Sequence, residues 1–99
     1  MTVNFEYVNV DVSETLNAFT EEKLKKIFNR YEFLISATVH FKIDDKQHET
    51  GKICSIELSL PGPRIFATSM ERNFEVSVRE TISDLERQLK KRKEVYKTH

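Results

Sequence analysis

The sequence is poor in the residues that build most catalytic and cofactor-binding loops. Among its 99 residues there are two glycines, two prolines, one cysteine and no tryptophan. With only Gly51 and Gly62, no glycine-rich loop can hold a phosphate group through its backbone N–H donors. No side chain stands in a recognisable nucleophile turn, so we expect neither an enzyme nor a cofactor. The single Cys54 excludes an internal disulfide and fits a reducing compartment.

Long apolar runs and targeting segments are also missing. No apolar stretch approaches the ~20 residues of a membrane-spanning helix. The first residues lack the basic and apolar regions of a secretory signal. Low-complexity tracts are absent too, so we expect one cytoplasmic domain over residues 1–99, with fraying confined to the extreme C-terminus. Neither a membrane nor a small-molecule substrate is expected as a partner.

Charge is balanced in total but uneven along the chain. Lys and Arg number 16, as do Asp and Glu. Residues 87–97 nevertheless hold six basic side chains and one acid, and residues 23–30 hold four basic side chains and no acid. The remaining positions therefore carry a net charge of −9. Two basic segments set against an acidic remainder favour a polyanionic partner, because such a field can steer a nucleic acid.

Hydrophobic periodicity predicts six secondary-structure elements. Apolar and polar residues alternate in four segments, which is typical of half-buried strands. These segments are 2–10, 35–44, 54–60 and 65–69. Spacings of three and four residues predict a helix over 14–29, capped by Ser13, and a second helix from Asn73 to about residue 97. The expected order is β-α-β-β-β-α.

This order has a simple solution in the α+β class. Both amphipathic helices would cover one side of a four-stranded, mainly antiparallel sheet, and the other side would face water. The charged segment 45–51 predicts a hairpin, and Pro61-Gly62-Pro63 predicts the next reversal. Beyond Leu89 the second helix has few apolar residues, so we expect its last turns to project from the body.

Cations align along both helices at 100° per residue. The aligned sets are Lys23, Lys26 and Arg30 on the first helix, Arg79, Lys90 and Lys97 on the second, and Arg87 with Lys91 on its opposite flank. If the helices lie side by side, one set from the second helix and the set from the first would bracket a groove. Cations at such intervals suit the phosphates of folded RNA or DNA.

A solvated helix face explains part of the same pattern. Glu86 and Lys90 are four residues apart, and Asp84 and Arg87 are three apart, as in many exposed helices. Charge alone therefore leaves nucleic-acid binding and simple solubility both open.

Other candidate sites have simpler explanations. His40 and His48 with Asp44, Asp45 and Glu49 follow no established metal-ligand spacing, so an outward histidine and a polar turn explain them better. Cys54 alternates in phase with Ile56 and is expected to pack as a small hydrophobe. Phe66 falls on the opposite face from its neighbours and, beside Ile53, predicts a minor apolar patch on the open sheet.

Three local stretches carry a resemblance to a known family. They are Leu24-Lys25-Lys26-Ile27, Ala67-Thr68-Ser69 and Asp84-Leu85-Glu86-Arg87-Gln88-Leu89-Lys90-Lys91. In these stretches, in its length and in its order of elements, the chain resembles the short hibernation-promoting factors of the ribosome-associated inhibitor family. The likeness spans nearly the whole chain, and the Leu-Glu-Arg-Gln-Leu segment is its most specific motif.

The resemblance implies a fold similar to double-stranded-RNA-binding domains, lodged between the head and body of the small ribosomal subunit. Members of that family cover the sites of messenger and transfer RNA and silence the ribosome in starvation or stationary phase. By position, the family's basic residues match Lys23, Lys26, Arg87, Lys90 and Lys91. The full candidate set for ribosomal RNA adds two residues from the aligned stripes, Arg30 and Arg79. The expected partner is the small subunit, bound by a protein that is monomeric elsewhere.

The sequence departs from the family pattern before and within the second helix. Where the family shows an acid, Asp-Met-Tyr and an Ala-Ile-Asp run, this chain reads Met70, Asn73-Phe74-Glu75 and Ser77-Val78-Arg79. The family's aromatic side chain is replaced by Glu75, whereas Arg79 adds a cation. We also expect no second domain of the kind by which long forms join two ribosomes.

Two other functions fit the same features. A general module for structured RNA would read duplex shape through phosphates and 2′-hydroxyl groups. A protein–protein adaptor would use the open sheet face around Ile53 and Phe66, with the basic helices serving only solubility. Steric occupancy of the small subunit by a non-catalytic inhibitor is the leading hypothesis.

Overall fold

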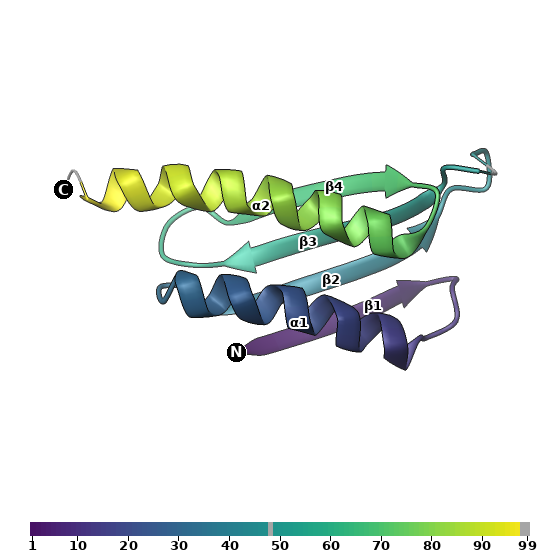
Figure 1. Ribbon diagram of the computed structural model, residues 1–99, viewed down its shortest axis with the longest axis horizontal. Coiled ribbons are helices and arrows are strands. Elements are labelled where there is room, and N and C mark those ends of the chain that lie inside the picture. The colour runs from purple at the N-terminus through teal and green to yellow at the C-terminus, as the bar shows by residue number, and fades with distance from the viewer. Residues whose placement is uncertain (48, 98–99) are drawn as a thin grey trace.

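A computed structural model describes residues 1–47 and 49–97, and within them the six elements follow the predicted order. They are β1 (Thr2–Val8), α1 (Glu14–Arg30), β2 (Ser36–Ile43), β3 (Lys52–Ser59), β4 (Ile65–Glu71) and α2 (Phe74–Lys97). The strands lie side by side in sequence order, with β1 parallel to β2 and the other pairs antiparallel. The predicted α+β class and mainly antiparallel sheet are confirmed (Figure 1).

Two turns show why strands end where they do. β1 stops at Val8, earlier than predicted, because Asn9 adopts the left-handed conformation with φ of 56°. In the β2–β3 hairpin, a Cβ atom on Gly51 would lie 2.5 Å from the carbonyl oxygen of Asp44. Only glycine allows the two strands to close at this point.

Polar side chains cap the start of both helices. Ser13 Oγ accepts a hydrogen bond from Leu16 N at 3.1 Å, as its predicted role requires. Asn73 Oδ1 accepts one from Val76 N at 2.8 Å, so Asn73 precedes α2 as its cap and is not its first residue.

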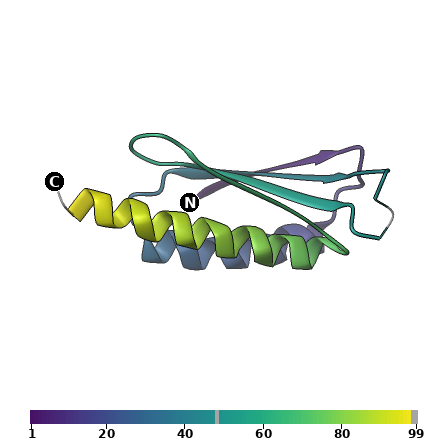
Figure 2. The same cartoon turned by 90° about the horizontal axis from the view of Figure 1, so that it is seen from above.

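Both helices cover the same face of the sheet, and the opposite face is bare (Figure 2). α1 lies over β1 and β2, and α2 lies over β3 and β4. Each helix runs opposite to the strand before it, so the two helices are parallel to each other. Phe41, Leu24, Ile56, Leu58 and Leu85 are among the largest fully buried side chains of the core between these layers. None of the helices among the described residues has the length and apolarity to span a membrane.

Two small hydroxyl side chains hold α2 against the backbone of β3. Ser77 Oγ donates a hydrogen bond to Lys52 O. The Thr81 hydroxyl is shared between Ser77 O of its own helix, at 2.7 Å, and Cys54 O of β3, at 3.2 Å. Thr81 and Ser77 are both fully buried. Because their side chains are short, the helix can approach the strand closely, and the bonds fix its position along the sheet.

The last turns of α2 are attached to the body at two points. α2 extends past the end of the sheet, as predicted (Figure 1). However, Arg92 Nη1 donates to Pro61 O at 3.4 Å, the Tyr96 hydroxyl donates to the same oxygen, and the Tyr96 ring packs against Phe33. The expectation of a projecting helix after Leu89 is therefore only partly met.

The hydroxyl of Thr81 should contribute measurably to stability. We expect Thr81→Val to lower the free energy of unfolding by about 1–2 kcal/mol, because it removes a buried hydrogen bond while keeping the side-chain volume. Urea denaturation would measure this loss. The matched control is Thr68→Val, whose hydroxyl bonds Ser55 Oγ at 2.7 Å on the exposed sheet face. Equal losses for both variants would contradict the anchoring role.

Burial should also make the thiol of Cys54 unreactive. Removal from water raises the pKa of Cys54 to about 12, so almost none of it is thiolate near neutral pH. We expect a thiol reagent to label the folded protein far more slowly than the urea-unfolded chain at about pH 8. Labelling of the folded protein at the unfolded rate would contradict the buried position.

Candidate nucleic-acid interface

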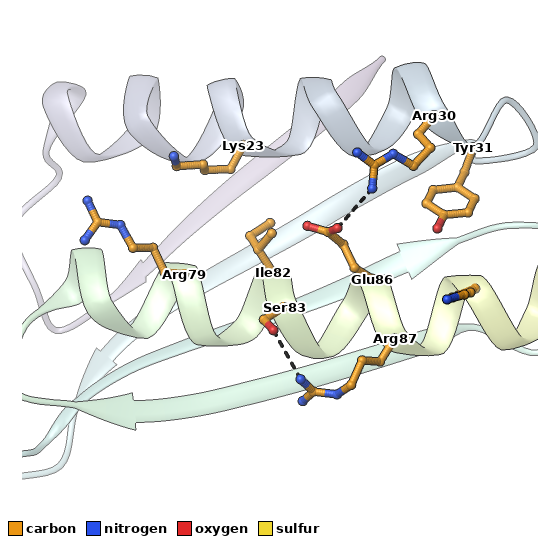
Figure 3. A pocket seen from close by; sticks show the side chains of 9 residues that line it. Lys23, Arg30, Tyr31, Arg79, Ile82, Ser83, Glu86 and Arg87 are labelled. Carbon is orange, nitrogen blue, oxygen red and sulfur yellow. Dashed lines mark hydrogen bonds and ion pairs between the residues drawn. The ribbon is translucent and has the colours of Figure 1, made fainter.

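Cations from both basic segments meet in a groove between the two helices. This interhelical groove has a volume of about 550 Å³. Lys23 and Arg30 reach into it from α1, and Arg79 and Glu86 reach into it from α2 (Figure 3). Lys90 also lines it. Of the two alternative stripes on α2, the one containing Arg79 and Lys90 is therefore the stripe that faces α1.

The floor of the groove is apolar and its walls are charged. Ile82 lies beneath it and Ile27 lies beneath a hollow beside it, and they are exposed by only 7% and 3%. Lys26 lines the adjoining hollow on the α1 side, together with Lys23 and Arg30. Among the described residues that line these two hollows, Glu86 is the only acid. A polyanion lying along the groove would therefore meet cations on both sides.

One ion pair crosses the groove. Arg30 Nη1 lies 3.2 Å from Glu86 Oε2, and the two side chains are 63% and 41% exposed (Figure 3). The sequence suggested Lys90 as the partner of Glu86, at a spacing of four residues. Arg30 takes that role because parallel packing of α1 and α2 brings residues 56 positions apart into contact.

An aromatic ring joins the cations at the other end of the groove. The Lys23 ammonium lies 5.2 Å from the centre of the Phe19 ring, and the Arg79 guanidinium lies 5.5 Å from it. Both distances allow a cation–π attraction. The Phe19 ring therefore stabilises two positive charges from different helices close to each other.

The second stripe of α2 lies at the outer rim of the groove, which Arg87 still lines. Arg87 points away from α1 and donates a hydrogen bond to Ser83 Oγ at 3.1 Å (Figure 3). It also lies 3.9 Å from Asp84, which confirms the predicted spacing but makes a weak pair. Lys91 is exposed. The candidate cations thus form an inner row, Lys23, Lys26, Arg30, Arg79 and Lys90, and an outer pair, Arg87 and Lys91.

A second hollow, which we call the aromatic pocket, continues the groove toward the C-terminal ends of both helices. It has a volume of about 440 Å³ and shares Arg30 and Tyr31 with the groove. Phe33, Tyr96 and Lys93 line it further along. The sequence did not indicate this pocket, because Tyr31 and Tyr96 fit the apolar faces of their helices. Only the unusual density of aromatic residues near Tyr31 could have indicated it.

On the open sheet face, Phe66 and Ile53 do not form the predicted apolar patch together. Phe66 is 53% exposed, but its neighbour on β3 is Glu57, whereas Ile53 pairs with Met70. The expected contact between Phe66 and Ile53 is therefore wrong, because the register of β3 and β4 places them at different levels.

Histidine on this face has a carboxylate partner. His40 Nε2 lies 2.7 Å from Glu6 Oε2 on the parallel strand β1. Within residues 1–47 and 49–97, no group of three or more His, Cys, Asp or Glu side chains could hold a metal ion. His48, which was considered as a ligand from the sequence, lies outside the described residues.

The fold and the groove together define an α+β domain that presents cations on its helical face. The chain belongs to the family described as "Sigma 54 modulation protein / S30EA ribosomal protein", whose sequence profile matches residues 3–97. This membership agrees with the resemblance found in the sequence.

Two solved structures share this fold. The chain is similar to a ribosomal subunit interface protein from Coxiella burnetii, with 28% identity and a TM-score of 0.84, over 94% of this chain and 98% of the other. The N-terminal domain of Protein Y from Thermus thermophilus shares the fold, with 19% identity and a TM-score of 0.78, over 92% and 98%. A comparison with curated protein sequences gave no match.

The ion pair across the groove should limit the affinity of the groove for anions. We expect Glu86→Gln to bind heparin more tightly and elute at higher salt, because it removes a negative charge from the groove and frees Arg30. The stability change should stay below about 1 kcal/mol, since the pair is exposed. Glu57→Gln is the matched control, as it breaks an exposed pair with Arg64 on the opposite face. Equal shifts in elution for both variants would contradict a binding role for the groove.

Proposed function

We propose that this chain is a non-catalytic ribosome hibernation factor that binds the small ribosomal subunit. Its helical face would grip ribosomal RNA, and its bulk would occupy the sites of messenger and transfer RNA. Family membership and the likeness to a ribosomal subunit interface protein support a role at the ribosome. The observation that carries the proposal is the convergence of both basic segments on one groove.

The proposed contacts divide between the two rows of cations. The inner row would face phosphates that lie along the groove, where cations on both walls can act on the same segment of RNA. The outer pair, Arg87 and Lys91, would reach a second strand or a neighbouring turn of RNA. Each contact releases condensed counterions, so affinity should fall steeply with salt.

Occupancy is the whole of the proposed mechanism. A rigid domain that fills the path of messenger and transfer RNA needs no chemical step, and its inhibition depends only on affinity and position. The dense core and the capped helices provide the rigidity. The proposed location is the cytoplasm, where the ribosome is found.

Removal of inner-row cations should weaken binding to small subunits. We expect the double variant Lys23→Ala/Lys90→Ala to co-sediment less. The slope of log affinity against log salt should fall by about 0.7–0.9 for each phosphate that is no longer neutralised. Sucrose-gradient sedimentation over a series of salt concentrations would measure both quantities. The same variant should inhibit translation less strongly in a cell-free extract.

The controls separate this proposal from its alternatives. Lys42→Ala/Lys46→Ala removes two exposed cations away from the helical face, and it should leave binding unchanged. Equal weakening by that variant would refute the assignment of the inner row. Competition by an unrelated RNA hairpin at the same affinity would indicate a general RNA-binding module. Loss of binding in Phe66→Leu alone would indicate an adaptor that uses the sheet face.

A further inference from the structure

The aromatic pocket differs from the groove in the chemistry that it offers. Tyr31, Phe33 and Tyr96 contribute three rings within one hollow. The ring centres of Tyr31 and Phe33 are 5.9 Å apart, and those of Phe33 and Tyr96 are 5.0 Å apart. Such a cluster gathers flat apolar surfaces, whereas the groove gathers mainly charges. The pocket is therefore suited to a flat and largely uncharged group.

We propose that the aromatic pocket binds one unstacked nucleobase of a single-stranded RNA segment whose phosphates follow the interhelical groove. This inference rests on the proposed function and names the part of the RNA that this end of the molecule would hold. The two hollows share Arg30 and Tyr31, so a strand in the groove leads directly into the pocket.

The geometry of the rings leaves a surface for stacking. The planes of Phe33 and Tyr96 meet at 87°, so the edge of one ring covers the face of the other. In such a pair only one of the two rings has a face covered by its partner. Phe33 and Tyr96 are also only partly buried, whereas Tyr31 belongs to the core at 7% exposure. Nucleobases stack on aromatic faces of this kind in proteins that bind single strands.

The charges around the pocket favour a nucleotide over a plain apolar group. Arg30, Lys93 and Lys97 line it, and Glu32 is the only acid among the described lining residues. The Lys93 ammonium lies 5.8 Å from the centre of the Tyr31 ring, at a position from which it could also meet a phosphate. A base bound in the pocket would therefore have cations beside its own backbone.

Helix direction explains why the base, and not a phosphate, would occupy this end. Because α1 and α2 are parallel, both of their C-terminal ends lie beside the pocket. Each end carries a partial negative charge of about half an electron, which disfavours an anion close by. The phosphate of the bound nucleotide would therefore depend on Arg30 and Lys93, and the other phosphates should lie over Lys23, Arg79 and Lys90.

Matched RNAs would test the proposal on the full-length chain. We would compare a single-stranded RNA of about six nucleotides with an RNA of equal length and charge that lacks its interior bases. Fluorescence anisotropy of an end-labelled strand at low salt would give both affinities. We expect the strand with bases to bind about fivefold more tightly or better, since stacking on a ring contributes this much. Equal affinities, or no binding of either strand, would overturn the proposal.

Ring variants locate the effect. Phe33→Leu and Tyr96→Leu should abolish most of the difference between the two RNAs and leave the salt slope unchanged, because they remove no cation. If Phe33→Leu fails to fold, Tyr96→Leu still tests the proposal, since Tyr96 lies in the last turns of α2, beyond the sheet. Phe66→Leu is the matched control on the opposite face, and it should preserve the difference. A salt slope that falls in the ring variants would also overturn the proposal.

Further measurements separate this inference from neighbouring ones. Adenosine monophosphate that binds as tightly as the longer strand would assign the pocket to free nucleotides and overturn its link to the groove. If the protein co-sediments with small subunits but shows no preference for bases, base binding in the pocket is refuted and the proposed ribosomal partner is not. A preference for bases without co-sedimentation would refute the proposed ribosomal partner and leave the pocket as an RNA site.

Discussion

The rest of the structure depends on two helices being packed in parallel on one face of the sheet. The connection from β1 through α1 to the parallel strand β2 places α1 on that face, and the turn after β4 returns α2 to the same face. Burial of Leu24, Leu85 and Leu89 stabilises this layer. Each fully buried side chain of this size contributes about 1.5–3 kcal/mol. The groove exists because these residues hold the helices together.

That packing carries an electrostatic cost which the core has to exceed. Inner-row cations from two helices are brought near one another, and parallel helix dipoles place like ends together. In water, two unit charges 4 Å apart repel by only about 1 kcal/mol, so several buried leucines outweigh the repulsion. Glu86 and the Phe19 ring reduce it further. In α1, the acidic Glu14 lies in the first turn and the basic Arg30 lies in the last turn. Each charge is opposite in sign to the dipole end beside it, which is stabilising.

Local patterns in the sequence were enough to predict the elements. They were not enough to predict the contacts between elements. The alternation from Ala37 to Phe41 identified β2 because one of its faces is covered. Helical spacing gave two alternative stripes on α2, but only packing against α1 could choose between them. The pairing of Arg30 with Glu86 depends on that choice. The neighbour of Phe66 depends on the register across the Pro61-Gly62-Pro63 turn, which the pattern of apolar residues leaves free.

The zero net charge limits the distance over which the protein would attract its proposed partner. A protein of high positive charge binds any polyanion at long range, whereas this chain has 16 basic and 16 acidic residues. Its proposed attraction to RNA would come from the cations gathered along the interhelical groove, and it would fade within a Debye length of about 8–10 Å. A lone duplex touches only one side of such a surface. An RNA cleft that faced both rows of cations at once would gain every contact within that short range, so cations gathered on one surface of a neutral protein would favour a binding site that encloses it.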